Sequence, residues 1–274
     1  LVRPRQHAGD VSAAGDGLQQ MLTQGLPIPR YPGLRMGLPA KQALIRAWSL
    51  RRPDVVHVVT EGPLGWSALA AAHKLKLPVS SDFRTNFHAY SGHYGIGWLR
   101  KPIAAYLRKF HNRTALTLVP TETMRGELAS LGFRNLQVIA RGVNTGLFNP
   151  ARRSDALRAT WSAAAEDTVV LYVGRLAPEK NLEPLIDAYD RICASDVRAR
   201  LVFVGDGPAR DGLRTRCPQA VFAGTRRGED LAAHYASGDL FLFPSLTETF
   251  GNVTLEAMAS GLAVVAYDYA AAAA

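Results

Sequence analysis

Cysteine is scarce in this chain of 274 residues, which holds only Cys193 and Cys217. Two cysteines exclude both a disulfide framework and a cysteine-rich metal cluster, so a reducing cytosol is the expected compartment. The sequence also lacks an apolar run of the roughly 18 residues that span a bilayer, and no charged-then-apolar signal segment opens it. Because 47% of the residues are hydrophobic, the chain can bury a sizeable core, and its length favours two domains.

Negative charge is scarce in the first half of the chain. Residues 1–150 hold 19 Lys and Arg against 7 Asp and Glu, a balance of +12, whereas residues 151–274 hold 13 against 16, a balance of −3. This asymmetry indicates two domains with different partners. Nucleic acid, anionic lipid headgroups and phosphorylated substrates all suit the basic half, and charge alone does not choose among them.

Short apolar runs alternate with helical patterns after a loose stretch rich in Gly, Pro and Gln at residues 6–40. The runs are rich in β-branched and aromatic residues, which is typical of strands buried on both faces of a parallel sheet. They lie at residues 55–60, 78–82, 116–120, 136–140, 168–176, 200–205, 221–224, 240–244 and 262–267. Between them, apolar residues three or four positions apart, such as Leu182, Leu185 and Tyr189, predict helices.

This alternation predicts an α/β protein with two Rossmann-like, doubly wound parallel-sheet domains. The first domain would span residues 1–143 and the second residues 153–274, with a linker rich in Gly, Asn and Pro at residues 144–152. Both ends look cut, because residues 1–5 resemble the tail of a strand and no helix follows the last apolar run. We therefore expect an interior segment of a longer protein, incomplete at both ends.

Residues with binding chemistry follow the predicted strands of the second domain, where doubly wound sheets bind ligands. Arg175 and Lys180 lie on the turn after the first of these strands. A guanidinium and an ammonium together suit a diphosphate, although the alternative is two solvated surface charges. Gly205, Asp206 and Gly207 follow the next strand.

The stretch SLTETFGNVTLEA, residues 245–257, places Glu248 and Glu256 around Gly251. Gly251 permits a turn at which backbone N–H groups approach a ligand closely, and a helix starting near Asn252 would supply further donors for an anion. A phosphate repels carboxylates, so each glutamate is better suited to neutral hydroxyls. Hydroxyls on both sides of a diphosphate indicate a nucleotide sugar. Alternatively, Glu256 is a first-turn glutamate favoured by the helix dipole, and Glu248 is a cap or surface residue.

Three stretches resemble the nucleotide-sugar domain of the family 4 retaining glycosyltransferases, whose GT-B fold has two Rossmann-like domains facing across a cleft. They are VGRLAPEKNLEPLIDAY, LVFVGDGPAR and FPSLTETFGNVTLEAMASGLAVVAYD. The family's two glutamates, separated by seven residues, are matched by Glu248 and Glu256. The first half resembles the acceptor domain of the family through RPDVVHVVTEGPLGWSALAAAHKLKLPVSSDFRTNFHAYSGHYG and TLVPTETMRGELASLGFRNLQVIARGVNTGLFNP. The chain is especially similar to bacterial GDP-mannose-dependent α-mannosyltransferases and to sulfolipid synthase-type lipid glycosyltransferases.

The resemblance implies roles for the matching residues. Arg175 and Lys180 would bind the diphosphate and stabilise the leaving nucleotide, so that positioned cations replace a metal. The sequence agrees, since it has no Asp-x-Asp pair, the metal-holding device of the other large glycosyltransferase fold. Glu248 would bind the transferred sugar and Glu256 the ribose. The remaining matches would contact sugar and phosphate through the backbone (Phe250, Gly251, Asn252, Val253) or lie near the nucleoside (Gly205, Asp206, Gly207).

The chain departs from the family pattern in the acceptor domain. Many relatives carry a histidine followed by a threonine after the strand at residues 78–83, where this chain has Arg84. Arg84 could hold a phosphate or an anionic acceptor, but it is not a general base at neutral pH. His88 and His93 lie nearby and could titrate, although such histidines are more often surface or loop residues. The family's first glycine-rich loop and closing helix are missing, so the fragment alone is expected to be inactive or poorly stable.

Residues 97–114, GWLRKPIAAYLRKFHNRT, mix aromatic and aliphatic residues with five Lys and Arg. A basic amphipathic segment with a tryptophan such as Trp98 docks on anionic bilayers. The alternative is a helix with one face in the core and the other in solvent. We expect a cytoplasmic protein that contacts the anionic membrane face peripherally.

Taken together, these features predict a retaining, metal-independent hexosyltransferase. It would move a hexose, with mannose favoured, from GDP-mannose or a UDP-sugar to a lipid or glycan acceptor, with no other cofactor. One alternative is a nucleotide-sugar epimerase of the same fold, which usually needs further carboxylates and histidines in the cleft. A nucleic-acid-binding protein is suggested by the net charge of +9. It is disfavoured because the basic residues belong to no recognisable recognition module, so no nucleic-acid partner is expected.

Overall fold

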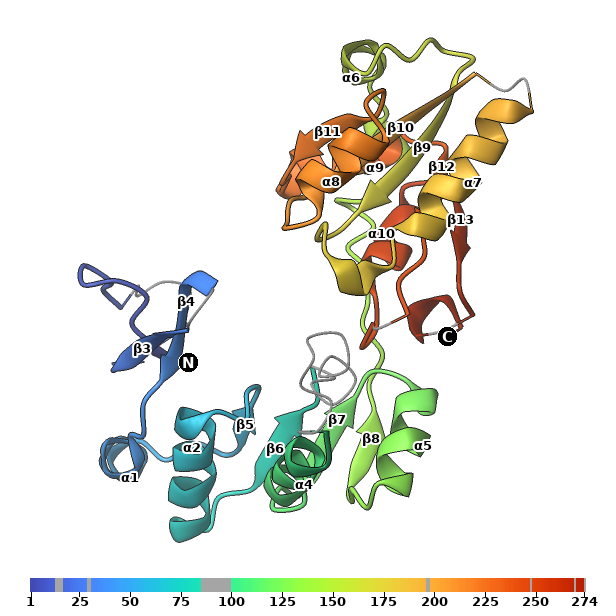
Figure 1. The fold of residues 1–274 in the computed structure, drawn as a ribbon. Helices are drawn as coiled ribbons and strands as arrows, with labels where there is room; N and C mark the ends of the chain where they lie inside the picture. The colour runs from blue at the N-terminus through green and yellow to red at the C-terminus, as the bar shows by residue number, and fades with distance from the viewer. Residues whose placement is uncertain are drawn as a thin grey trace. The chain divides into compact units, whose positions relative to one another are not determined.

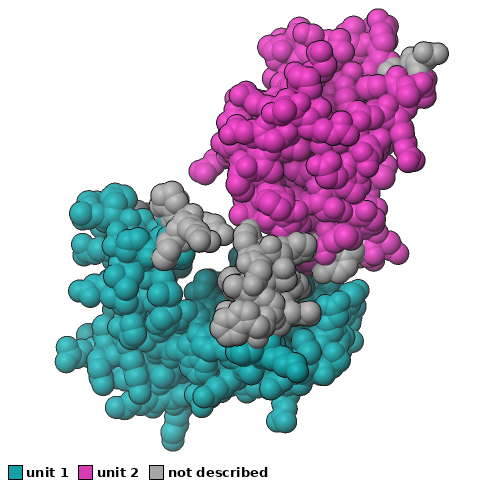
Figure 2. Space-filling view, viewed as in Figure 1, with its two compact units in different colours: residues 1–85, 101–139 teal, residues 86–100, 140–274 magenta. Residues whose placement is uncertain are grey.

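The computed structural model describes residues 1–12, 17–28, 31–84, 100–195, 198–246, 248–268 and 270–273. The chain divides into two compact units, residues 1–85 with 101–139 and residues 86–100 with 140–274 (Figure 2). Each unit has its own hydrophobic clusters. The domain and linker bounds given above remain predictions.

The first unit is built on a parallel sheet of four strands in the order β5-β6-β7-β8 (Figure 1). The strands are β5 (Val56–Val58), β6 (Val79–Asp82), β7 (Leu116–Val119) and β8 (Leu136–Val138). The helices that alternate with them are α2 (Pro63–Lys74), α4 (Arg100–His111) and α5 (Glu122–Ser130), and α1 (Lys41–Leu50) packs on α2. The strands coincide with the first four apolar runs, which confirms the parallel α/β pattern predicted for this half.

Helix α4 contributes to both hydrophobic clusters of the first unit. Phe110 packs with residues of β5, β6 and α2, whereas Leu107 packs with residues of β7 and α5. Ile103 is partly buried against the second of these clusters. Ile103, Leu107 and Phe110 of α4 therefore face the core, whereas Lys101 and Lys109 are exposed. Trp98 and Leu99 lie outside the described residues.

The loose stretch expected at residues 6–40 is wrong, because strands form there. Strand β1 (Val2–Pro4) pairs in parallel with β2 (Met21–Thr23), and β3 (Gly25–Ile28) pairs antiparallel with β4 (Tyr31–Gly37). A Cβ at Gly37 would lie 2.7 Å from the Leu64 side chain, so the end of β4 packs tightly on α2. Local Gly and Pro content predicts loops, but backbone pairing, between distant β1 and β2 and between neighbouring β3 and β4, stabilises strands that local propensity disfavours.

The second unit contains a five-stranded parallel sheet in the order β11-β10-β9-β12-β13. The strands are β9 (Thr168–Val173), β10 (Ala199–Val204), β11 (Val221–Gly224), β12 (Leu240–Phe243) and β13 (Ala263–Ala266). The chain first moves outward from β9 to β11 and then returns to the other side of β9. The connection that follows β9 leads to one side of the sheet, and the connection that follows β12 leads to the other. The point between these two strands is the topological switch point, where such sheets bind ligands.

Helices alternate with the strands of this sheet in the chain. They are α7 (Glu183–Ala194), α8 (Arg210–Arg216), α9 (Gly228–Ala236) and α10 (Asn252–Ala259), preceded by α6 (Asp155–Thr160). Helix α10 packs against α9 and β13. The described residues of this unit also form the short 3₁₀ turns η2 (Pro150–Arg152), η3 (Pro178–Lys180) and η4 (Ala270–Ala272). Within the described residues of both units, no helix is long and apolar enough to cross a membrane.

Strand β9 is buried on both faces, with Val169, Val170, Leu171 and Tyr172 all inaccessible to solvent. This confirms that its continuous apolar run marks a central parallel strand. An aromatic column crosses the core beside it. The ring of Tyr172 stacks on Phe243 with 6.3 Å between centroids, and the column continues through Phe241 to Tyr235.

Candidate functional site

The strongest cluster of polar side chains lies at the switch point of the second unit. The loop after β9 carries Lys180, and the loop after β12 carries Ser245 and Glu248. The Lys180 ammonium forms an ion pair with Glu248 Oε1, and the Ser245 hydroxyl donates to the same oxygen at 2.7 Å. Asn181 Nδ2 donates to the Pro244 carbonyl at 3.3 Å, which further joins the two loops. The structure thus places Lys180, which is predicted to bind the diphosphate, beside Glu248, which is predicted to bind the transferred sugar.

Arg175 forms an ion pair with Glu179, four residues further along the same loop. The Glu179 side chain is 1% exposed, whereas Arg175 is exposed. A carboxylate buried to this extent needs a charged or hydrogen-bonding partner, and Arg175 supplies one. Glu179 was not singled out from the sequence, because its role depends on its burial in the fold.

Tyr172 supports this loop from the core. Its hydroxyl donates to the Arg175 carbonyl at 3.1 Å. Burial raises the pKa of the Tyr172 phenol well above its usual range, and the negative charges of Glu248 and Glu179 raise it further. The phenol therefore stays protonated and acts as a donor that holds the turn after β9. Nothing in the sequence singled out Tyr172 within the apolar run at residues 168–176.

Gly251 adopts φ = +88°, a left-handed conformation that favours glycine, and it caps helix α10. Asn252 and Val253 begin the helix, so their N–H groups belong to the first turn, which has no intrahelical acceptors. Phe250 is buried, and its carbonyl accepts from the Ala271 N–H at 2.7 Å. This confirms the predicted helix start and turn, whereas contacts of these residues with a ligand remain predictions.

Glu256 lies in α10, and the Tyr235 hydroxyl donates to its Oε2 at 2.9 Å. The carboxylate is half-buried. Burial raises the pKa of Glu256, and the hydrogen bond from Tyr235 opposes that shift. Tyr235 itself is fully buried, and burial raises the pKa of its phenol well above the usual range. Glu256 therefore has a fixed donor on one oxygen.

The loop of Gly205, Asp206 and Gly207 packs directly on the loop after β9. A Cβ at Gly205 would lie 1.9 Å from the Gly174 carbonyl oxygen, and one at Gly207 would lie 2.3 Å from that of Leu176. The Leu176 N–H donates to the Asp206 carbonyl at 3.0 Å. These glycines are needed because two backbones approach closely. Their proximity to a nucleoside remains a prediction.

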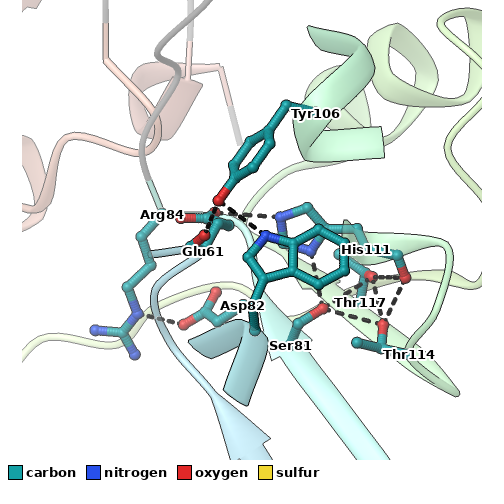
Figure 3. Close-up of polar contacts among 9 residues, drawn as sticks. Glu61, Ser81, Asp82, Arg84, Tyr106, His111, Thr114 and Thr117 are labelled. Carbon is teal, nitrogen blue, oxygen red and sulfur yellow. Dashed lines mark hydrogen bonds and ion pairs between the residues drawn. The ribbon is translucent and has the colours of Figure 1, made fainter. Parts of the chain in front are cut away.

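Arg84 belongs to the first unit, whereas Arg175, Lys180 and Glu248 belong to the second. It follows strand β6, and its side chain forms an ion pair with Asp82 while remaining 52% exposed (Figure 3). Because Asp82 ends β6, this pair lies at the carboxyl edge of the first unit's sheet. His88 and His93 lie outside the described residues.

A buried polar network lies behind that edge (Figure 3). His111 is inaccessible to solvent, and its Nε2 lies 3.2 Å from Glu61 Oε1 while its Nδ1 lies 2.9 Å from the Ser81 hydroxyl. The Ser81 hydroxyl also lies 3.1 Å from the hydroxyls of Thr114 and Thr117. An Nε2–H that donates to Glu61 and an Nδ1 that accepts from the Ser81 hydroxyl satisfy both partners. Sequence reasoning missed this network because its members are spread from residue 61 to residue 117.

Within the described part of the chain, no group of three or more His, Cys, Asp and Glu side chains is placed to hold a metal ion. The polar groups gathered at the switch point are instead two cations, their carboxylate partners and a helix N-terminus. Such a set can bind a phosphorylated ligand that also carries hydroxyls.

Comparisons with known families agree with this chemistry. Residues 167–274 match the family described as glycosyl transferases group 1, and residues 11–147 match glycosyltransferase family 4. The second match covers half of the chain. The chain belongs to the family 4 glycosyltransferases.

Several characterised proteins are similar in sequence. The sulfoquinovosyl transferase SQD2 of Arabidopsis thaliana is 36% identical over 91% of this chain and 49% of its own length. A GDP-mannose-dependent alpha-mannosyltransferase of Mycobacterium tuberculosis is 36% identical over 92% of this chain and 65% of its own length. An alpha-monoglucosyldiacylglycerol synthase of Streptococcus pneumoniae is 27% identical over 78% of this chain and 52% of its own length. The chain thus spans about half to two thirds of these relatives.

Solved structures are also similar to the chain in fold. The sucrose-phosphate synthase of Thermosynechococcus elongatus has a TM-score of 0.73 at 20% identity and covers 97% of this chain and 70% of its own. Anabaena HepE in complex with UDP has a TM-score of 0.72 at 20% identity, with coverages of 93% and 69%. These likenesses confirm the GT-B fold class predicted from the sequence.

Proposed function

We propose that the protein containing this chain transfers a hexose from a nucleotide-diphosphate sugar to a lipid or glycan acceptor, with retention of anomeric configuration and without a metal ion. The observation that carries this proposal is the cluster of Arg175, Lys180 and Glu248 at the switch point of the second unit. Family membership supports the reaction class. The relatives include a GDP-mannose-dependent enzyme, which makes GDP-mannose the first donor to test.

Lys180 and Arg175 would stabilise the charge that develops on the departing diphosphate. Both lie on the loop after β9, and the side chain of Lys180 is largely shielded from water. Cations held in place before the reaction stabilise developing charge without reorganisation. Their present partners, Glu179 and Glu248, keep the loop ordered and balance its charge. Positioned side-chain cations would thus do the work that a divalent metal does elsewhere.

Glu248 would accept hydrogen bonds from the hydroxyls of the transferred sugar, and Glu256 from those of the ribose. Gly251 and the first turn of α10 lie between the two glutamates in the chain. Backbone N–H groups there would meet the phosphates, while the carboxylates would meet neutral hydroxyls on either side. This arrangement fits a nucleotide sugar better than a nucleotide or a sugar alone.

The acceptor would be a lipid or a glycan bound by the first unit. The relatives include enzymes named for sulfoquinovosyl transfer and for monoglucosyldiacylglycerol synthesis. The basic balance of residues 1–150 and the exposed Lys101 and Lys109 of α4 would favour peripheral contact with anionic lipid at the cytoplasmic membrane face. Because Ile103, Leu107 and Phe110 of α4 pack in the core, this contact would be electrostatic at the described part of the helix. Arg84 would help to hold a phosphate or an anionic acceptor.

The test uses the whole protein with GDP-mannose and UDP-glucose as donors and diacylglycerol in phosphatidylglycerol vesicles as acceptor. We expect one donor to raise the melting temperature and to give a glycolipid whose anomeric configuration, determined by NMR, matches that of the donor. Transfer should persist after treatment with EDTA. An inverted product or a requirement for metal would contradict those parts of the proposal, and absence of nucleotide-sugar binding would contradict it entirely.

Membrane contact has its own test. We expect the whole protein to co-sediment with phosphatidylglycerol vesicles but not with phosphatidylcholine vesicles, and added salt should weaken the binding. Replacing both Lys101 and Lys109 by Gln should reduce binding, whereas replacing exposed Arg198 of the second unit by Gln should not. Equal failure to bind either vesicle would rule out peripheral attachment by charge.

A further inference from the structure

Tyr235 is a fully buried residue whose one polar atom contacts the candidate site. It lies on α9, and its ring packs at right angles to Phe148 with 5.6 Å between centroids and at an angle to Phe241 with 6.0 Å. Its hydroxyl donates to Glu256 Oε2 at 2.9 Å. A ring enclosed in this way has little freedom to move, so the hydroxyl is held at one place beside the carboxylate.

This contact determines how Glu256 presents its oxygens. An ionised carboxylate has about four lone-pair directions on two oxygens. The phenol occupies one of them on Oε2, which limits rotation of the carboxylate and leaves Oε1 in a defined orientation. Since Tyr235 remains protonated, it favours the ionised form of Glu256, which accepts hydrogen bonds only. Glu256 is thereby prepared to receive ligand hydroxyls.

We propose that Tyr235 is a positioning residue that orients Glu256 toward the ribose hydroxyls and so makes the site select ribonucleotides. This inference rests on the proposed function, because it takes the ligand to be a nucleoside diphosphate. Tyr235 itself does not touch the ligand. Its contribution consists of the preformed orientation of Glu256, which would otherwise have to be fixed at the moment of binding.

The experiment measures binding of ribonucleoside diphosphates and their 2′,3′-dideoxy analogues to the whole protein by calorimetry. GDP and UDP are compared with dideoxy-GDP and dideoxy-UDP. Tyr235→Phe removes only the hydroxyl and retains the packed ring. We expect this change to weaken the binding of the preferred ribonucleotide about tenfold, because the charged Glu256 loses a hydrogen bond that supports it. The dideoxy analogue should bind within about twofold of the wild-type value, because it makes no contact with Glu256 that could be lost.

Tyr189→Phe is the matched control in the same unit. The Tyr189 hydroxyl donates to the Ala199 carbonyl at 3.2 Å, so this variant, like Tyr235→Phe, loses one hydrogen bond donated by a phenol. We expect it to bind both classes of nucleotide as the wild type does. Melting temperatures of both variants show whether each remains folded.

The outcomes separate this inference from the proposed function. If the wild type binds neither nucleotide, the proposed function fails. If Glu256→Gln abolishes the preference for ribonucleotides while Tyr235→Phe retains it, the function stands and the role of Tyr235 is refuted. Equal weakening of ribo and dideoxy ligands by Tyr235→Phe would also refute it, because general loosening of the core affects both.

Discussion

Lys180 and Glu248 form an ion pair although 68 positions separate them in the chain. One follows β9 and the other follows β12, and these strands are neighbours in the sheet although β10 and β11 intervene in sequence. The pair therefore joins the two loops at the switch point of the second unit. It also makes Lys180 the residue whose removal tests the proposed chemistry most directly.

Replacing Lys180 by Ala should lower kcat about 100-fold or more, since loss of one preorganised electrostatic contact to the departing charge has effects of this size. The measurement is steady-state transfer by the whole protein with the donor at saturation. Arg198→Ala is the control, because it removes a cation from an exposed ion pair with Glu166. A Lys180→Ala variant that keeps kcat within about twofold would show that Lys180 does not act in the transition state.

Nucleotide binding should weaken on acidification at a pH above the usual glutamate range. Burial raises the pKa of Glu256 above the ordinary value of about 4.3. The ionised form accepts ribose hydroxyls, so affinity is complete above the raised pKa and declines as pH falls through it. Calorimetry from neutral to mildly acidic pH measures this decline. Glu256→Gln should bind more weakly at neutral pH and lack the decline, and a wild-type profile in the variant would contradict the assignment.

Gly205→Ala should destabilise the protein by about 2–4 kcal/mol, a range expected for a severe local clash at a strained position. The new Cβ would lie 1.9 Å from the Gly174 carbonyl oxygen, and the residue has φ = +140°. Gly212→Ala is the matched control, because that glycine lies in α8 with no atom within 4 Å of a Cβ. It should stabilise by about 0.5–1 kcal/mol through helix propensity. Urea denaturation measures both, and equal effects would refute the close approach of the two loops.

Stability of the second unit should fall as pH is lowered through the range in which histidine titrates. Burial lowers the pKa of His234, although the Asp230 carbonyl and carboxylate act in the opposite direction. The unfolded chain therefore binds the proton at a higher pH than the folded chain does. Stability is complete above the unfolded value of about 6.5 and declines as pH falls toward the lowered folded value. Urea midpoints at pH 7.5 and 5.5, both chosen as about one unit from that value, measure the decline. The decline in stability should be smaller in His234→Asn. An unchanged decline in that variant would show that protonation of His234 is not its cause.

Much of the fold was predictable from local pattern. Continuous apolar runs such as residues 168–176 identify parallel strands, because a strand buried on both faces has no polar positions. The strands at residues 6–40 were not predictable in this way. Their stability comes from backbone pairing, as when Val2 pairs with the distant Met21 and when Gly25 pairs with Gly37 in the neighbouring strand, and composition carries no record of that pairing.

The part of the candidate site whose residues lie close together in sequence was predictable. Glu248, Gly251 and Glu256 lie on one loop and helix, and Gly251 has the left-handed φ that its place before the helix suggested. Tyr172, Glu179 and Tyr235 were not foreseen. Each derives its role from burial beside a charged or polar group, and burial is a property of the assembled core.

The sequence alone determined the parallel α/β class, the family, and the types of residue at the strand ends, because periodicity and motif spacing are local properties of the chain. The tertiary structure decided which of these residues meet. It paired Lys180 with Glu248 and placed the Tyr235 hydroxyl on Glu256, since strand order and close packing set distances between positions that are remote in sequence.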